Sequence, residues 1–182
     1  MKRVHQIQAR GSSLFFRSTV AQEKLVVRGS KKVSLKTLLE LSLKHFSKFL
    51  DAESKKSGFG KRDFELSLTL CGAKKIKTLN NDYRGKNYAT DVLSFPVHEY
   101  PGRVFEYELT QYLNLGDIFI CLDVLLKQAK SRQVSQVEEF LDLFCHGFLH
   151  VLGYDHERSK TEEDEMFDLQ HKLLKKMIKE LG

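Results

Sequence analysis

The spacing of hydrophobic positions changes several times along the chain, and each change indicates a helix or a strand. Between residues 64 and 70 apolar and polar residues alternate, which is the period-two pattern of a half-buried strand. Residues 35–50 and 161–181 instead carry apolar residues three or four positions apart, the spacing of a helix with one buried face. Ser34 and Thr161 stand where the N-caps of these two helices are expected.

The same pattern, together with turn residues, predicts the remaining elements. Further helices are expected over residues 73–83, 123–132 and 135–152. Further strands are expected over residues 4–7, 14–16, 25–27, 91–97 and 115–122. The last is an apolar run, broken only by Gly116 and Asp117, that suits a central strand. Pro96 has no N–H to donate, so it should lie at a strand end or a sheet edge. Strands interleaved with helices predict an α/β (α+β) fold, in which a small mixed β-sheet is packed with helices.

Length and composition favour one domain. The 182 residues can bury a sizeable core, so we expect a single domain over residues 1–182. The chain has no apolar run near the roughly 18 residues that a membrane helix requires. The first residues are basic without a following apolar stretch, so we expect no secretory signal, a cytoplasmic location and no membrane partner.

The cysteines do not indicate a disulfide framework or a cysteine-rich zinc ribbon. Cys71, Cys121 and Cys145 are odd in number and lack paired spacing. Buried or free thiols are the expected state.

Charge is unevenly distributed along the chain. Residues 1–86 contain 20 Lys and Arg against 7 Asp and Glu, a balance of +13, whereas residues 87–182 carry 10 and 17, a balance of −7. A basic half suits a polyanion such as RNA, because Lys and Arg pair with phosphates and release counterions. On charge alone, a solvated basic face without a partner is the better interpretation.

Three histidines lie within eleven residues. His146 and His150 are four positions apart, so on a helix they stand on one face, one turn apart. Gly153 can end that helix and let the chain turn, which brings His156 back towards the same point. Three neutral imidazoles leave a fourth tetrahedral position for water, as in a catalytic zinc site. A lone histidine would favour an ordinary polar helix residue, but three at this spacing favour one metal ion, and imidazoles also suit nickel, copper or iron.

The spacing also matches the metzincin proteases, in which a Glu directly after the first histidine is the general base. Here that position is Gly147. The expected helix is therefore metzincin-like in its metal ligands but lacks the protease base, so a working peptidase is disfavoured.

Three segments together resemble one protein family. Residues 146–156 resemble the HGxLHLxGYDH signature of the YbeY family, with Val151 in place of a usual Leu. Residues 79–96 are similar to the family's LNxxYRxKDxxTDVLSFP segment, with Asn87 for a usual Asp, and residues 115–121 are similar to its LGDIxI strand. The segments occur in the family's order, and the resemblance spans roughly residues 64–178. Residues 1–30 look longer than the family norm and are expected to be an N-terminal extension.

The resemblance implies a bacterial, single-domain α/β protein with one zinc-type metal ion. It implies a hydrolase of phosphodiester bonds, a single-strand-specific endoribonuclease acting in small-subunit (16S-type) rRNA maturation and ribosome quality control. The implied partners are ribosomal RNA, the small ribosomal subunit and its assembly factors. The oligomeric state stays open.

The resemblance also assigns roles to single residues. His150 and Arg84 are the expected catalytic residues, with Arg84 holding a phosphate and stabilising charge in the transition state. Without the resemblance, Arg84 would be interpreted as a surface arginine near a helix end. Lys86 is expected to add a phosphate contact. Asp155 either orients a ligand imidazole from the second shell or caps the turn after Gly153.

Some roles stay open. Asp91, Ser94 and Asp117 either line the cleft or cap strands and turns. No residue occupies the usual position of the general base, so a metal hydroxide or a remote carboxylate are the alternatives. A non-catalytic ribosome-assembly factor with a structural metal is the second functional hypothesis, and a metalloprotease is the third.

Overall fold

The computed structural model describes residues 14–19, 24–26, 32–57, 63–97 and 112–182. The elements in chain order are β1 (Leu14–Thr19), β2 (Lys24–Val26), β3 (Lys32–Ser34), α1 (Leu35–Lys56), β4 (Asp63–Cys71), α2 (Ala73–Arg84), β5 (Val92–Pro96), β6 (Tyr112–Cys121), α3 (Leu122–Ser131), α4 (Gln136–Val151) and α5 (Lys160–Leu181). The strand expected over residues 4–7 lies outside the described residues.

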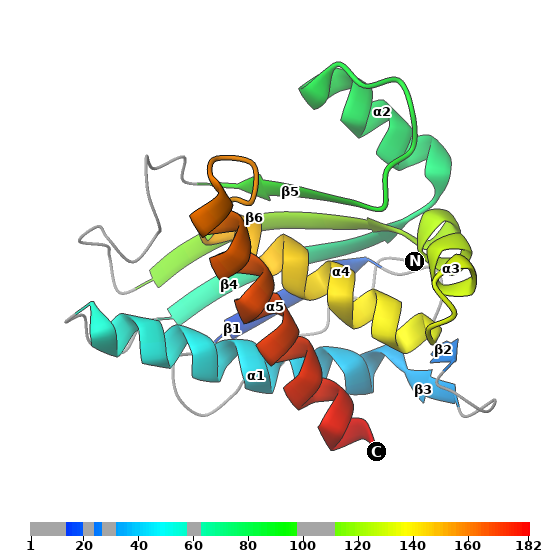
Figure 1. The fold of residues 1–182 in the computed structure, drawn as a ribbon. Helices are drawn as coiled ribbons and strands as arrows, with labels where there is room; N and C mark the ends of the chain where they lie inside the picture. Colours follow the sequence, from blue (N-terminus) through cyan, green and yellow to red (C-terminus); the bar gives the residue numbers. More distant parts are fainter. Residues whose placement is uncertain (1–13, 20–23, 27–31, 58–62, 98–111) are drawn as a thin grey trace.

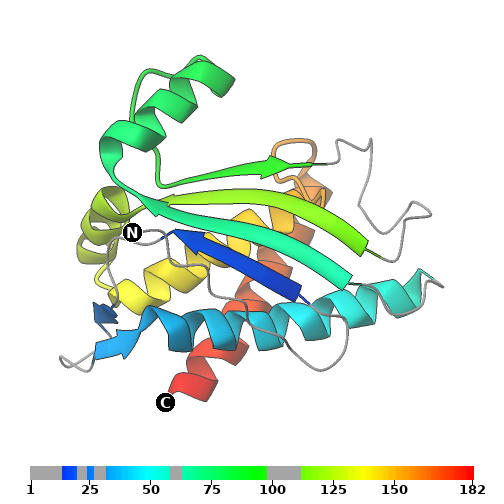
Figure 2. The same ribbon diagram turned by 180° about the vertical axis from the view of Figure 1, so that it is seen from behind.

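A four-stranded mixed sheet, in the order β1-β4-β6-β5, is the centre of the fold. Strands β1, β4 and β6 are parallel, whereas β5 runs antiparallel to β6 at the edge. Helices α1, α4 and α5 cover one face of this sheet (Figure 1), and the view from behind has the sheet in front of them (Figure 2). The predicted α/β fold with a small mixed sheet is confirmed, and Pro96 ends the edge strand as expected.

Strand β4 has the predicted alternation, because every second side chain from Phe64 to Leu70 is buried. The central strand predicted over residues 115–122 is confirmed: β6 lies between β4 and β5, begins already at Tyr112 and runs through Gly116 and Asp117. A register shift opposite Glu65 and Leu66 gives β6 one extra residue, which is a β-bulge. Gly116 has φ +128°, and a Cβ there would lie 2.1 Å from the Phe95 carbonyl oxygen, so glycine permits the close approach of β5.

Helix boundaries follow local capping. The Ser34 hydroxyl accepts a hydrogen bond from the Thr37 N–H at 3.1 Å, which confirms it as the N-cap of α1. Thr161 is not the N-cap of α5. Ser159 has extended backbone, and its hydroxyl accepts from the Glu162 N–H at 3.2 Å, so the helix already begins at Lys160.

Helix α4 is fixed in the core by its apolar face, which packs against α1. The ring of Phe46 in α1 stacks on Phe148 with centroids 3.9 Å apart and meets Phe144 edge to face at 5.1 Å. All three rings are fully buried. The N-terminus of α4 has a reciprocal capping box between Ser135 and Glu138. The side of α4 that faces away from these rings is therefore held in a fixed position.

The three cysteines are free and buried, as predicted. Burial and, to a smaller extent, the neighbouring Cys121 on β6 raise the pKa of the Cys71 thiol to about 11. Of the helices in the described ranges, none is long and apolar enough to cross a membrane.

Candidate metal centre

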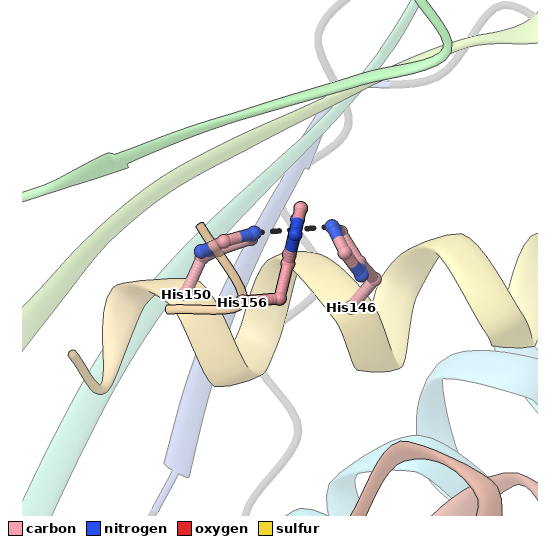
Figure 3. Close-up of side chains that lie close together, drawn as sticks. All are labelled: His146, His150 and His156. Carbon is pink, nitrogen blue, oxygen red and sulfur yellow. Dashed lines mark hydrogen bonds between the residues drawn. The ribbon is translucent and has the colours of Figure 1, made fainter. Parts of the chain in front are cut away.

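The three clustered histidines converge on one point (Figure 3). Helix α4 places the Nε2 atoms of His146 and His150 3.0 Å apart. Gly153, at φ +88°, follows the end of the helix, and the loop returns His156 to the pair. The ring centroid of His156 lies 5.1 Å from that of His146 and 5.2 Å from that of His150. One ligand atom from each ring lies within 4.8 Å of the others, which suits a single ion.

Two of the three imidazoles, those of His146 and His150, favour the neutral form. Burial lowers the pKa of His146, and burial together with the neighbouring His146 and His156 lowers that of His150 to about 4. Neutral imidazoles are the form that binds metal ions. At neutral pH these two rings therefore need to lose no proton before they bind a cation.

A glutamine from α5 determines which nitrogen of His146 carries its hydrogen. The Gln170 Nε2 donates to the Asp142 carboxylate at 2.6 Å, and a carboxylate only accepts. The amide oxygen of Gln170 therefore faces His146, whose Nδ1 lies 3.0 Å away and must donate. The Nε2 of His146 is left with a free lone pair directed at His150.

The His150 ring lies opposite that lone pair. A hydrogen bond with the backbone of Tyr154 opposes the fall in the pKa of His150. The His150 Nε2 lies 3.0 Å from the His146 Nε2. The His146 lone pair can therefore accept a proton from His150 or bind a cation. Two nitrogen ligands of a tetrahedral zinc ion lie roughly 3.4 Å apart, so the donor set fits such an ion.

Asp142 is itself part of an ionic network. The Arg132 Nη1 donates to Asp142 at 3.1 Å and to both oxygens of Glu139, at 3.2 and 3.0 Å. Glu139 is 1% exposed, so its charge is stabilised by Arg132. The chain of contacts from Arg132 through Asp142 and Gln170 to His146 holds the imidazole from behind.

Sequence reasoning missed Gln170. A signal was present, because Gln170 interrupts the apolar stripe of α5 between Met166 and Leu173, and all three are buried. A polar residue on a buried face needs a partner, but spacing alone does not reveal which one. Phe167 on the same helix packs nearly parallel to the His156 ring, with centroids 5.5 Å apart, and forms an apolar wall.

Gly147, the position of the missing protease base, faces the sheet rather than the histidines. A Cβ there would lie 2.9 Å from Ile118 Cγ2 and 3.0 Å from Ser94 Oγ. A glutamate at this position has no room, so the protease mechanism is blocked by the packing of α4 on β5 and β6.

We expect Gly147→Glu to lower the free energy of unfolding by roughly 3–5 kcal/mol or to prevent folding, because it buries an unpaired charge. Chemical denaturation followed by circular dichroism measures the change. Thr78→Glu adds the same charge at an exposed position of α2 and should be nearly neutral. A stable Gly147→Glu protein would contradict this account of the helix packing.

Arg84 ends α2 and lies across from the histidine loop. Its Nη2 is 4.0 Å from the Glu157 carboxylate, and Glu157 directly follows His156. The Arg84 side chain is 47% exposed, so it is available to a ligand. Lys86 is exposed and, in the part of the chain described, has no ion pair.

The remaining candidates have structural contacts. Asp155 accepts a hydrogen bond from the Glu157 N–H at 2.9 Å and pairs with Arg158 at 3.1 Å. These contacts correspond to the second role considered for Asp155, the capping of the turn after Gly153. Within the described ranges it has no hydrogen bond to an imidazole, and Gln170 occupies that role instead.

Two strand residues also serve the fold. Asp91 accepts from the Val92 N–H at 2.8 Å and from Gln128 at 2.9 Å at the start of β5. Ser94 donates to the Gly147 carbonyl at 3.3 Å, which ties β5 to α4. Asp117 is exposed on β6.

Comparisons with known proteins show which family this chain resembles. The family model described as Endoribonuclease YbeY matches residues 29–178. A protein named Endoribonuclease YbeY from Spiroplasma citri is 44% identical over 110 residues, which cover 60% of this chain and 68% of that protein. One of the same name from Aquifex aeolicus is 38% identical over 130 residues, 71% of this chain and 81% of that protein.

A solved structure is similar over nearly the whole chain. The solution structure of TM1509 from Thermotoga maritima covers 92% of this chain and 91% of its own, with a TM-score of 0.55 and 28% identity. The family match includes α4 with His146 and His150, the loop with His156 and the segment that carries Arg84. The chain belongs to the YbeY endoribonuclease family.

Proposed function

We propose that this protein is a zinc-dependent endoribonuclease that cleaves single-stranded RNA by hydrolysing a phosphodiester bond. The observation that carries the proposal is the convergence of three imidazoles on one point, across from Arg84. The names of the relatives from Spiroplasma citri and Aquifex aeolicus, both Endoribonuclease YbeY, support RNA as the substrate.

His146, His150 and His156 are the proposed metal ligands. Zinc suits three imidazoles with a further position left for solvent or substrate. When bound, the ion supplies Lewis-acid chemistry: it polarises a phosphoryl oxygen and makes water a nucleophile near neutral pH. Gln170 keeps the His146 ring in the tautomer that directs Nε2 to this point.

Arg84 is the proposed phosphate-binding residue. Its planar guanidinium can donate two parallel hydrogen bonds to phosphate oxygens, and it stabilises negative charge that develops on them. Its contact with Glu157 spans 4.0 Å between exposed groups, which is a weak pair that a phosphate can displace. Lys86, two residues further along, adds a second positive charge for the RNA backbone.

The proposed cellular substrate is small-subunit ribosomal RNA, in maturation and ribosome quality control. The small subunit and its assembly factors are the proposed partners, and a ribosomal substrate implies activity in the cytoplasm. A ribosome-assembly factor with a structural metal is the second candidate, because Gly147 removes the usual general base and Asp142 and Asp155 are bonded elsewhere.

One experiment separates these two functions. Protein purified free of other nucleases is incubated with a single-stranded RNA and with a duplex of the same sequence, and its metal content is measured in parallel. We expect cleavage of the single strand, loss of cleavage with a chelator and recovery with zinc. Folded, metal-loaded protein that cleaves neither the single strand nor the duplex would contradict the nuclease proposal and favour the assembly factor.

We expect Gln170→Met to weaken zinc binding by roughly 10- to 100-fold, since the His146 ring loses the group that orients it. A competition titration against a coloured chelator measures this affinity without any activity assay. Gln128→Met is the matched control, because Gln128 also donates to a carboxylate, Asp91, but does not touch the histidines. Equal zinc affinities in both variants would show that Gln170 serves stability alone.

A further inference from the structure

Exposed hydrophobic residues lie close to Arg84 in the sequence. Among the described residues the exposed large hydrophobics are Tyr83 (69%), Tyr88 (55%) and Val97 (52%), all within a span of fifteen residues. The two tyrosines stand on either side of Arg84 and Lys86 in the sequence. Exposed apolar side chains that occur together often mark a site of contact with another molecule. We therefore consider these two tyrosines as a contact site.

The Tyr83 ring and the backbone of Tyr88 are held in place. The Tyr83 ring meets Phe95 edge to face with centroids 5.0 Å apart, and Phe95 packs in the same manner on Phe119 at 5.7 Å. The carbonyl of Tyr88 accepts a hydrogen bond at 2.9 Å from the side chain of Asn80, which is 1% exposed. Ordering the Tyr83 ring on binding therefore costs little conformational entropy.

The surface around the rings is basic. Residues 73–88 contain five basic side chains and one acidic one, Asp82, a balance of +4. The basic residues are Lys74, Lys75, Lys77, Arg84 and Lys86, and all are exposed. Within the described residues, Arg84 has the 4.0 Å pair with Glu157, and Lys75 lies over the Phe119 ring. Helix α2 stands beyond the edge strand β5, apart from the helical layer, in both views (Figures 1 and 2).

We propose that Tyr83 and Tyr88 form a base-stacking platform for single-stranded RNA, which delivers the sugar-phosphate backbone to Arg84. The proposal rests on the proposed function and specifies how the substrate is held. Aromatic rings stack on any base, whereas the neighbouring positive charges pair with phosphates. Bases inside a duplex are already stacked and offer no free face, so the platform selects unpaired RNA.

Two probes separate stacking from charge pairing. One is a twelve-residue oligoadenylate, and the other is a ribose-phosphate oligomer of equal length without bases. We expect Tyr83→Leu or Tyr88→Leu to weaken oligoadenylate binding roughly 5- to 150-fold and to leave binding of the abasic oligomer unchanged. Tyr83→Phe retains the ring and should bind like the wild type. Lys74→Ala should weaken both probes alike and reduce the salt dependence.

Fluorescence gives a direct readout of stacking. The chain has six tyrosines and no tryptophan, so its ultraviolet emission comes from tyrosine. Oligoadenylate should quench part of this emission in the wild type and less in each leucine variant, while buried Tyr154 is unaffected.

The outcomes distinguish this inference from the proposed function. Leucine variants that are folded and bind oligoadenylate as tightly as the wild type would overturn the stacking platform, even if the protein cleaves RNA. Wild-type protein that neither binds nor cleaves RNA would overturn the proposed function together with it.

Discussion

Replacing His150 by alanine is expected to remove bound metal and RNA cleavage while the fold persists. The His150 Nε2 faces that of His146 at 3.0 Å, so its loss leaves two of three converging imidazoles. We expect zinc affinity to fall by more than about 100-fold, beyond what the loss of a group that only orients a ligand causes. Cleavage of single-stranded RNA should fall to background.

Metal analysis after dialysis, a cleavage assay and circular dichroism check this result on one sample. The matched control is His171→Ala, which removes an exposed histidine of α5 outside the cluster. It should keep both metal and activity. A His150→Ala protein that retains one equivalent of zinc would show that the histidine cluster is not the metal site.

Reversing the charge of Arg84 is expected to separate metal binding from catalysis. Arg84→Glu should reduce cleavage by roughly 10²- to 10³-fold, the effect of removing one group that stabilises transition-state charge. Zinc content should stay unchanged, because Arg84 contacts Glu157 and none of the three histidines. Arg84→Lys should lie between, since it keeps the charge but loses the planar fork.

The control for charge is Lys127→Glu, which makes the same reversal at an exposed position of α3. Arg84→Ala is a second test, because a glutamate beside Glu157 adds a repulsion that alanine does not. Full activity in both Arg84 variants would assign phosphate binding to other residues and leave the metal centre intact.

Much of the fold could be predicted because its signals are local. The alternation from Phe64 to Leu70 and the cap at Ser34 depend on neighbours within a few residues. The error at the start of α5 arose where two local solutions compete. Ser159 and Thr161 can each cap a helix, and the loop after His156 decides in favour of Ser159.

The candidate metal centre, too, could be predicted only in part. By itself the sequence determined the spacing of His146 and His150 on one helical face and the glycine break that returns His156, because helical geometry is a local property. Tertiary structure decided that Gln170, twenty-four residues from His146, sets its tautomer, and that the sheet excludes a side chain at Gly147. It also decided that Arg84 faces the histidine loop. These relations depend on the packing of distant elements, which the order of residues along the chain does not reveal.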